Sequence, residues 1–273
     1  MSETGINRIT SRDNAFIKDL RRLSHDNTAY RKQGRFWVEG DHLCRAALER
    51  GQKPVVAVFS KSFEVQALGK WTQFASKSIV IPDSMFLDIS GLESSAQMQM
   101  GFVFELPQVM ELQPGVASVI LDRVQDAGNV GSILRSAAAF GFRQVIALKG
   151  TAALWSPKVL RAGMGAHFGL HLVEAVTLEA LQALKIPIVV TSSHQGLLLQ
   201  EQSLPMPCAW ALGHEGQGVC DELLARAGLS VRIGQPGGEE SLNVAAAAAI
   251  CLHASSLVRQ LEPPAATGHV GQK

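Results

Sequence analysis

Three separate stretches of the sequence place polar side chains beside glycines, in patterns that suit the binding of a charged ligand. The first, DRVQDAGNVGSILR, contains Asn129 and, six residues later, Arg135. The second, LGHEGQG, has Glu215 as its one acidic group. The third, IGQPGGEESLN, ends on Ser241 and Asn243, just before a run of alanines. Glycine lets a backbone approach a ligand closely, and these side chains are able to orient it and to stabilise charge.

Each stretch taken alone also has a structural explanation. Asn129, and either Ser241 or Asn243, are residue types that cap helices, and a lone glycine cluster is weak evidence for a ligand. Arg135 lies among apolar residues, which on its own favours an exposed helix edge over a bidentate anion contact. No Asp, Glu, Lys or Arg occurs from Ser241 to Val258, so we expect a fully buried helix there. A buried Asn243 would then need hydrogen-bond partners.

The hydrophobic pattern of the second half of the chain predicts the elements that position these stretches. We expect strands over 117–122, 144–148, 187–193, 208–213 and 229–233, and helices over 129–140, from Pro157 onward, over 177–184, over 221–227 and after Asn243. Such alternation predicts a mostly parallel sheet covered by helices. Ligands bind these sheets beyond the carboxyl ends of the strands. Each of the three stretches follows a predicted strand, so we expect all three at that edge.

The first hundred residues predict a second, smaller α/β unit. The expected elements are helices over 13–23 and 42–50 and strands over 55–59, 78–81 and 100–106. Residues 111–115, ELQPG, have the composition of a linker. We therefore expect one domain over residues 1–112, a second over 116–262, and a disordered tail over 263–273.

Charge is unevenly distributed along the chain. The formal net charge is +1, so bulk charge does not indicate a nucleic-acid partner. From Arg8 to Arg45, however, nine Lys or Arg stand against five acidic residues. A local excess of this kind is typical of a phosphate-binding surface and, on charge alone, about equally of an ordinary solvated surface.

Other features narrow the class of protein. Four cysteines without a C-x-x-C pair argue against a disulfide framework and a zinc ribbon. His167 and His171 have the spacing of a helical metal pair, but their segment, GAHFGLHLV, reads as a strand, so we expect no metal. The N-terminus lacks an apolar signal core, and Asn243 and His253 interrupt the C-terminal apolar stretch. Neither secretion nor a membrane span is therefore expected.

The three stretches, taken together and in order, resemble one known family. The patterns N-V-G-x-x-x-R, L-G-x-E-G-x-G and I-x-x-x-G-x-x-x-S-L-N-V are similar to those of the SpoU (TrmH) class of SPOUT methyltransferases. These enzymes methylate the ribose 2′-oxygen of RNA with S-adenosyl-L-methionine. The resemblance covers about residues 116–260. The segment ITSRDNAFIKDLRRL…RKQGRFWVEGDHLCRAAL also resembles the substrate-binding domain of many members, which is itself similar to a ribosomal RNA-binding protein.

This resemblance implies an α/β fold with a trefoil-knotted, parallel-sheet SPOUT domain and a small N-terminal α/β RNA-binding domain. It also implies a cytoplasmic homodimer that binds S-adenosyl-L-methionine, acts on rRNA or tRNA, and needs neither a metal nor a membrane. The implied catalytic residues are Asn129, Arg135, Glu215, Ser241 and Asn243. The implied cofactor-binding residues are Leu212, Gly213, Gly218, Ile233, Gln235, Leu242 and Asn243. The implied RNA-binding residues are Arg21, Arg22, Arg31, Arg35 and Arg135.

The chemistry of methyl transfer agrees with these residue types. A sulfonium methyl group needs the ribose oxygen in line and close, and it needs the hydroxyl proton to leave. In the family the residue at Arg135 is the proposed base. A guanidinium stays protonated at neutral pH, so we expect Arg135 to hold the adjacent phosphate and stabilise the forming oxyanion. Asn129 and Ser241 would orient Arg135 or the ribose, and Glu215 would anchor a loop or a cofactor group.

The sequence also bears on two other classes of function. A Rossmann-type enzyme needs a glycine fingerprint after the first strand, and ASVILDRVQDAGNVG lacks that glycine order. A non-catalytic RNA-binding or ribosome-assembly factor on the same fold would be favoured by loss of Asn129 or Arg135, and both are present.

His214, in the second stretch, is interpreted as a loop histidine without a role.

Overall fold

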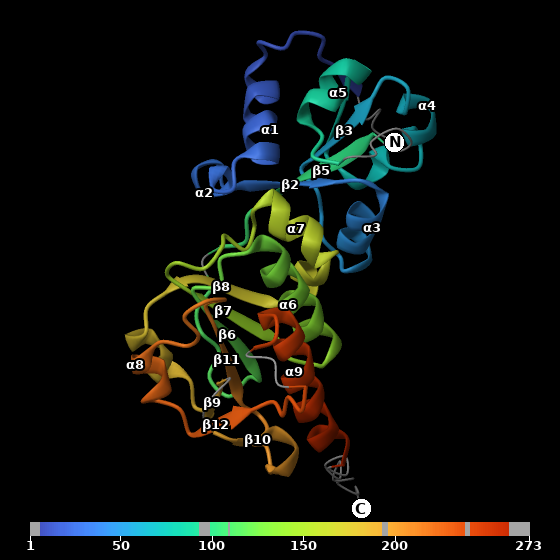
Figure 1. Ribbon diagram of the computed structural model, residues 1–273. Helices are drawn as coiled ribbons and strands as arrows, with labels where there is room; N and C mark the ends of the chain where they lie inside the picture. Colours follow the sequence, from blue (N-terminus) through green and yellow to red (C-terminus); the bar gives the residue numbers. More distant parts are fainter. Residues whose placement is uncertain (1–5, 93–98, 109, 193–195, 238–240, 262–273) are drawn as a thin grey trace, which may run out of the picture.

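A computed structural model describes residues 6–92, 99–108, 110–192, 196–237 and 241–261 of the chain. Its strands form two sheets, one from each half of the sequence, which lie one above the other in Figure 1. The last strand of the first sheet ends at Glu105 and the first strand of the second begins at Ser118. The predicted linker, 111–115, lies between them.

The first sheet is mixed and has five strands, ordered β1-β4-β3-β5-β2. Strands β1, β4 and β3 run parallel, whereas β5 pairs antiparallel with both β3 and β2. Its elements are β1 (Ile6–Arg8), α1 (Ala15–His25), α2 (Ala29–Gln33), β2 (Arg35–Glu39), α3 (Asp41–Glu49), β3 (Val56–Ser60), α4 (Glu64–Ala67), the 3-10 helix η1 (Thr72–Phe74), β4 (Lys77–Ile81), α5 (Asp83–Ile89) and β5 (Met100–Glu105). The two predicted helices and three predicted strands are confirmed, with small shifts at their ends.

The second sheet has seven strands, all parallel, in the order β10-β12-β9-β11-β6-β7-β8. This confirms the parallel sheet predicted from the alternating pattern. Its elements are β6 (Ser118–Asp122), α6 (Ala127–Ala139), β7 (Gln144–Leu148), α7 (Pro157–Gly163), η2 (Ala166–Gly169), β8 (His171–Val176), η3 (Glu179–Ala183), β9 (Ile188–Thr191), β10 (Leu197–Leu198), η4 (Leu199–Glu201), β11 (Ala209–Gly213), α8 (Asp221–Leu224), β12 (Leu229–Arg232) and α9 (Val244–Leu261).

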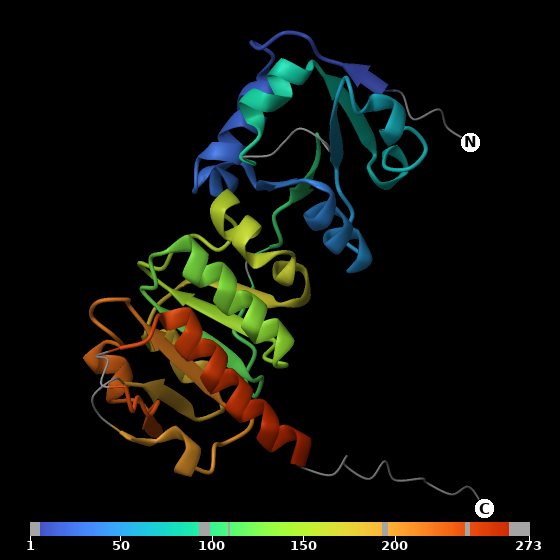
Figure 2. The same ribbon diagram turned by 45° about the vertical axis from the view of Figure 1, so that its right-hand side comes forward.

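Helices cover both faces of this second sheet, because successive strand residues point to opposite sides. Val119 and Leu121 of β6 belong to the core shared with α6, α7 and α9. Ile120, between them, belongs to a second core shared with η3 and α8. Figure 2 shows α6 (green) and α9 (red) side by side across one face. The strand ends are therefore held rigidly between two packed layers.

The C-terminal helix α9 is only half buried, so the predicted full burial is wrong. One side of α9 packs on the sheet, where the indole Nε1 of buried Trp210 donates to Oγ of buried Ser255 at 2.8 Å. On the other side Ile250 is 40% exposed and Leu257 45% exposed. The absence of charged residues from Ser241 to Val258 therefore reflects two apolar faces, of which the described residues cover only one.

Two other predicted elements differ in type. The helix predicted over 177–184 is the short 3-10 turn η3, although Thr177 does accept a hydrogen bond from the amide of Ala180 as a cap would. The strand predicted for GAHFGLHLV begins only at His171. Before it the chain turns through η2, because Gly165 adopts a left-handed conformation with φ of 85°.

The two halves of the molecule contact each other through aromatic and charged side chains. Phe36 of β2 packs against Trp155, with ring centroids 4.6 Å apart. The hydroxyl of buried Tyr30 lies 2.8 Å from both carboxylate oxygens of Glu174 in β8. That carboxylate also accepts the amide of Leu154 at 2.7 Å. Glu174 thus joins α2 of the first unit to the loop that follows β7.

The predicted linker is itself held against the second sheet. The amide of Gln113 donates to Oε1 of buried Gln144 at 2.7 Å, and Nε2 of Gln144 donates back to the carbonyl of Gln113 at 3.2 Å. Nε2 of His171 contacts the carbonyl of Glu111 at 2.6 Å.

Within the described residues, no helix has the length and apolar character needed to cross a bilayer.

Candidate active site

The carboxyl ends of three parallel strands bring the three polar stretches to one edge. Strand β6 ends at Asp122, which lies in register with Gly213 at the end of β11. Strand β12, which precedes the third stretch, is separated from β11 only by β9. The loops 123–126 and 214–218 therefore leave the sheet as neighbours, and the start of α9 meets them there.

Glu215 ties the second loop to the first through three hydrogen bonds. Its carboxylate accepts the backbone amides of Gln125 at 3.2 Å and Asp126 at 3.1 Å, and Nδ2 of Asn129 at 3.0 Å. Partial burial alone would raise the pKa of Glu215, but the hydrogen bonds from Asn129 and the backbone amides outweigh it and lower the pKa to about 2. Glu215 is therefore an ionised acceptor at neutral pH.

Asn129 extends this network to the third stretch. Its Oδ1 accepts a hydrogen bond from Nδ2 of Asn243 at 2.9 Å. Asn243 in turn caps α9, because its Oδ1 accepts the amides of Ala245 at 2.9 Å and Ala246 at 3.2 Å. Asn129 is half-buried and Asn243 is exposed, so the predicted burial of Asn243 is wrong. The partners predicted for Asn243 are nevertheless present.

Asp126, rather than Asn129, caps α6. Its Oδ1 accepts the amide of Asn129 at 2.8 Å, and the helix begins at Ala127. Asn129 therefore lies in the first turn, where its side-chain amide is available to Glu215 and Asn243. Aspartate and asparagine cap helices about equally well, so residue type alone did not distinguish the two positions.

A second set of contacts, which the sequence did not reveal, holds the loop 214–218. Arg123 has a φ of 59°, which residues other than glycine rarely adopt. Its guanidinium donates to both carboxylate oxygens of Asp122, at 2.8 and 3.1 Å, and to Oε1 of Gln217 at 2.9 Å. Asp122 also accepts the amide of Cys220 at 2.7 Å. Burial would raise the pKa of Asp122, but the hydrogen bonds from Arg123 and Cys220 lower it.

His214 closes the turn between β11 and Gly218, so the interpretation of this histidine as a residue without a role is wrong. Its Nδ1 accepts the amides of Gly216 at 3.0 Å and Gln217 at 3.2 Å. Its backbone pairs with Gly218 in both directions, at 3.0 and 2.8 Å. Because Nδ1 is an acceptor here, a neutral His214 carries its proton on Nε2.

Arg135 and Ser241 lie outside the hydrogen-bonded network. Arg135 is exposed on α6, and its guanidinium has no hydrogen bond or ion pair to another described residue. Ser241 is exposed three residues before α9 begins. Both side chains are thus available to a ligand.

A family model described as the SpoU rRNA methylase family matches residues 117–253, half of the chain. The chain belongs to the SpoU rRNA methylase family. One relative, the 23S rRNA (guanosine(2553)-2′-O)-methyltransferase RlmP of Bacillus subtilis, is 28% identical over 248 residues, which cover 90% of this chain and 97% of the relative.

Two further SpoU-type matches agree. The 23S rRNA (guanosine-2′-O-)-methyltransferase RlmB of Coxiella burnetii is 34% identical over 182 residues, covering 65% of this chain and 69% of the relative. The crystal structure of an AdoMet-bound rRNA methyltransferase from Sinorhizobium meliloti is 27% identical, with a TM-score of 0.79, and covers 94% of this chain and 99% of that one. The α/β fold with a parallel-sheet SPOUT domain expected from the sequence is therefore confirmed, and the structural match extends over both halves of the molecule.

The residues that the SpoU resemblance assigns to the cofactor fit an adenosyl ligand. A Cβ atom on Gly213 would lie 2.0 Å from the carbonyl carbon of Gly218, so only glycine lets the loop return across the strand end. Gln235 has a buried Oε1 with no hydrogen-bond partner among the described residues, and Leu242 is 40% exposed. A buried acceptor and an exposed apolar side chain suit a ligand that has hydrogen-bond donors and apolar surface.

The remaining cofactor candidates line the same edge. Leu212 is buried at the end of β11, Ile233 packs on the core just after β12, and Gly218 has a φ of 70°.

In the part of the chain that the structure describes, no group of three or more His, Cys, Asp or Glu side chains is arranged to hold a metal ion. His167 is buried, and burial lowers its pKa to about 4.

Three of the four arginines that the SpoU resemblance assigns to RNA in the first unit are engaged by acidic side chains. The pairs are Arg21–Asp88 at 3.7 Å, Arg22–Asp19 at 3.4 Å and Arg31–Glu174 at 3.5 Å. Arg35, by contrast, is exposed and has no hydrogen bond or ion pair to another described residue. The four arginines are therefore not equivalent.

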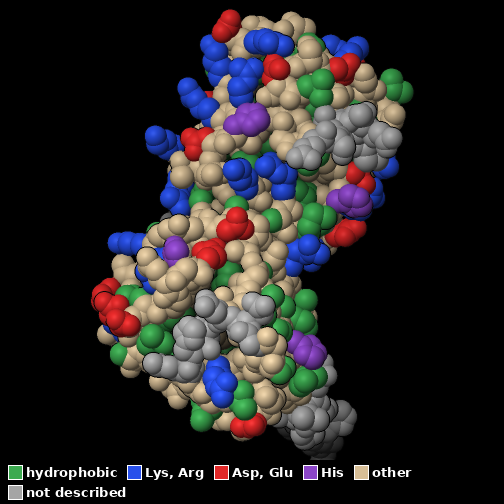
Figure 3. Space-filling model, viewed as in Figure 1, with side chains coloured by type: hydrophobic (Ala, Val, Ile, Leu, Met, Phe, Trp, Pro, Cys, Tyr) green, Lys and Arg blue, Asp and Glu red, His purple; other side chains and the backbone are tan. Residues whose placement is uncertain are grey.

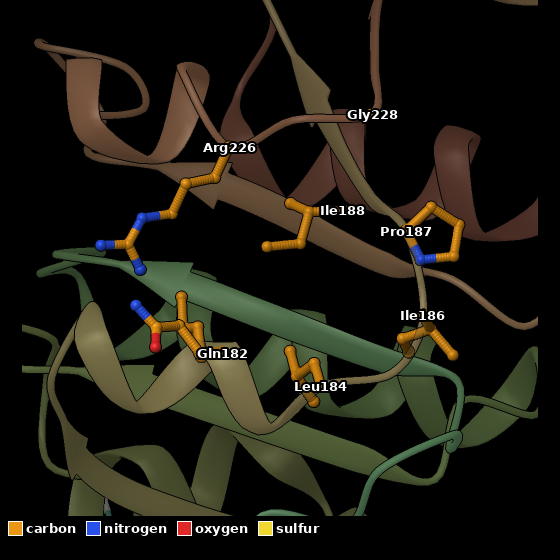
Figure 4. Close-up of a pocket in the computed structure, with 8 residues that line it drawn as sticks. Gln182, Leu184, Ile186, Pro187, Ile188, Arg226 and Gly228 are labelled. Atoms are coloured by element: carbon orange, nitrogen blue, oxygen red, sulfur yellow. The ribbon is translucent and has the colours of Figure 1, made fainter.

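A cavity of about 400 Å³ lies away from this site (Figure 4). Pro187 and Gly228 line it, and these residues immediately precede β9 and β12. Figure 4 shows Arg226 and Gln182 together at one end of the cavity and Ile186 at the other. The cavity is thus at the amino ends of the strands, opposite the Glu215 network.

Proposed function

We propose that this chain is an S-adenosyl-L-methionine-dependent methyltransferase that modifies a ribose 2′-oxygen in rRNA or tRNA. Membership of the SpoU family supports the reaction, and the names of RlmP and RlmB favour rRNA over tRNA. The AdoMet-bound relative supports the methyl donor. The observation that carries the proposal is the hydrogen-bonded chain from Glu215 through Asn129 to Asn243, which joins three family stretches at one edge of the sheet.

The proposed division of labour follows the two sheets. Residues 1–112 form the RNA-binding domain, residues 116–262 form the methyltransferase domain with its trefoil knot, and the tail proposed for 263–273 lies outside the described residues. The contacts of Glu174 with Tyr30 and Leu154 would fix the orientation of one domain against the other.

The cofactor would lie against the loops that follow β11 and β12. Leu212, Ile233 and Leu242 would provide apolar contacts, and Gln235 would accept a hydrogen bond at its unpartnered Oε1. Gly213 lets the loop return close to the end of β11, and Gly218 has open space where a side chain would begin, which leaves room for the ligand beside the backbone. The bound cofactor supplies an electrophilic methyl group on a sulfonium sulfur. The task of the protein is then to bring the ribose oxygen into line with it.

Arg135 would act on the RNA rather than on the cofactor. Its charge is permanent and no acidic side chain among the described residues neutralises it, so it is suited to hold a phosphate next to the reacting ribose. The same charge would stabilise the oxyanion as the hydroxyl proton leaves. This role requires no proton transfer to the guanidinium.

Asn129 and Asn243 would act as positioning residues, and exposed Ser241 would contact the ribose or its phosphate. Glu215 is poorly suited to remove a proton, because its pKa is about 2 and its oxygens already accept three N–H groups. Its role in this proposal is to hold the loop 214–218 against α6. The four residues thus shape the site, while Arg135 supplies the charge.

The proposed enzyme is a cytoplasmic homodimer. Its interface would include the uncovered face of α9, where Ile250 and Leu257 are exposed. Apolar side chains of this size on one helix face are suited to pairing with the same face of a second copy. Size-exclusion chromatography with light scattering tests this part of the proposal.

The reaction is tested by incubating the protein with tritiated S-adenosyl-L-methionine and total RNA from cells that lack it, followed by nucleoside mapping. The proposal expects labelled 2′-O-methyl nucleosides in wild-type reactions and their loss in Arg135→Ala. It fails if cofactor binds normally and no 2′-O-methyl nucleoside becomes labelled.

A further inference from the structure

A small hollow lies on the first unit between α1 and the edge strand β2. Its volume is about 170 Å³. The floor is apolar and almost fully buried, formed by Leu20, Leu23 and Val103. The rim includes Phe16, which is half-buried, and Arg35, which is exposed. The hollow is smaller than the pockets that take whole drug-sized ligands, so its capacity suits a single flat ring.

Positive charge is concentrated around this hollow. Between Arg12 and Arg35 the chain has seven Lys or Arg and three Asp, although its overall net charge is only +1. Figure 3 shows the blue Lys and Arg side chains gathered along the edge formed by α1 and α2. This positive charge would attract a polyanion to the edge formed by α1 and α2.

Among the arginines from Arg12 to Arg35, only Arg35 has no acidic partner in the part of the chain that the structure describes. Asp19, also on the rim, is paired with Arg22 at 3.4 Å, and its backbone carbonyl accepts Nε2 of Gln33 at 3.1 Å. These contacts fix the polar part of the rim. They leave the guanidinium of Arg35 beside the apolar floor, without a partner among the described residues.

From this arrangement we infer that the hollow binds one unpaired base of the RNA, stacked on Phe16, with Arg35 on an adjoining phosphate. The inference rests on the proposed RNA substrate. Single-stranded RNA is recognised by stacking splayed bases on aromatic rings beside cationic groups. A duplex does not offer such a base, so this site selects looped or single-stranded segments over helices.

The test compares two 12-nucleotide probes by fluorescence anisotropy at low salt: oligouridine, and an oligomer of the same length that lacks bases. Phe16→Leu keeps an apolar side chain but removes the stacking face. It is expected to weaken oligouridine binding about tenfold and to leave binding of the abasic oligomer unchanged. Phe74→Leu is the matched control, because Phe74 is 42% exposed on η1, away from the hollow, and is expected to change neither affinity.

Arg35→Gln separates the phosphate contact from the base contact. It is expected to weaken both probes alike and to reduce the slope of log affinity against log salt by about 1. Arg143→Gln, at an exposed position on the second unit, is the control for loss of one charge. A melting curve for each variant checks that it is folded.

Photo-crosslinking needs no variant and locates the base directly. Oligouridine carrying 4-thiouridine is expected to form its adduct on the tryptic peptide Asp13–Lys18, which contains Phe16.

The inference is overturned if wild type binds the two probes equally, if Phe16→Leu and Phe74→Leu behave alike, or if adducts form only elsewhere. These measurements use neither cofactor nor turnover. Base-dependent binding without methylation would therefore contradict the proposed function but not this base-binding site. Methylation without base-dependent binding would contradict the base-binding site but not the proposed function.

Discussion

The side-chain amide of Asn129 donates a hydrogen bond of 3.0 Å to the carboxylate of Glu215, 86 residues further along the chain. The same amide group accepts from Asn243, so one residue of α6 contacts both of the other loops. Because each loop follows a different strand, this contact fixes the relative positions of three strand ends. The first two predictions test what depends on it.

Replacement of Asn129 by alanine removes both links at once. We expect methyl transfer to fall about 100-fold, the scale seen when a preorganised donor is lost from an active site. The protein should remain folded, since Asp126 still caps α6. Single-turnover methyl transfer measures the effect. Ser132→Ala, an exposed position on the same helix, is the control and should keep full activity.

Glu215→Gln tests the charge on the second loop. The folded-state pKa of Glu215 is about 2, below its usual 4.5, so its ionised form stabilises the fold above pH 4.5. That contribution, about 1 kcal/mol for so exposed a group, is lost as the pH falls from 4.5 towards 2. Urea unfolding should therefore give a gap between wild type and Glu215→Gln that is constant at pH 6–8 and closes below pH 4.5. A gap that does not change with pH would contradict this account, and Glu222→Gln on α8 serves as the control.

Arg135→Ala should abolish methylation while cofactor binding stays within about twofold of wild type, because Arg135 is exposed and makes no hydrogen bond or ion pair with another described residue. Arg135→Lys keeps the charge but not the bidentate geometry, so we expect partial activity. Calorimetric titration with S-adenosylhomocysteine and a turnover assay together measure both effects. Unchanged turnover in Arg135→Ala would remove this residue from the mechanism.

Arg123→Gln should loosen the loop 214–218 by removing the hydrogen bonds to Asp122 and Gln217. We expect cofactor affinity to fall about tenfold, since charge-assisted hydrogen bonds are roughly twice as strong as neutral ones. Hydrogen exchange at the amide of Cys220, which Asp122 holds, should speed up in parallel. Slower or equal exchange at that amide would show that Arg123 does not hold the loop.

Tyr30→Phe removes only the hydroxyl that contacts Glu174 at the junction of the two units. The carboxylate then loses a donor, and we expect the free energy of unfolding to fall by about 1–3 kcal/mol. Cofactor affinity should not change, because Glu174 lies on β8 at the far end of the sheet from β12. Urea unfolding and calorimetry on the same samples measure the two quantities. A loss of cofactor affinity as large as the loss of stability would show that the junction acts on the site.

Residue types and spacing predicted the parallel sheet and the meeting of the three loops, because strand ends in such a sheet share one edge. They did not identify which residue caps α6, since Asp126 and Asn129 are both good caps and only the traced backbone distinguishes them. Arg123 was missed because its contacts depend on a positive φ, which no spacing pattern reveals.

Burial was the least predictable property. Asn243 was expected to be buried because an uncharged alanine run follows it, yet it caps α9 at the open edge of the sheet. The strand β2 was also missed, since RFWVE has a charged residue at each end and lies at the edge of its sheet. Its pairing with β5 depends on residues far along the chain, such as Val103, which lies 66 positions beyond its register partner Trp37. The local sequence pattern does not contain that information.

A crystal structure with S-adenosylhomocysteine tests the central claim most directly. The account expects the ligand at the carboxyl edge of the sheet, in contact with Gly213, Gln235 and Leu242, and with the Glu215–Asn129–Asn243 network intact beside it. Ligand bound instead at the amino ends of the strands, in the cavity lined by Pro187 and Arg226, would contradict it.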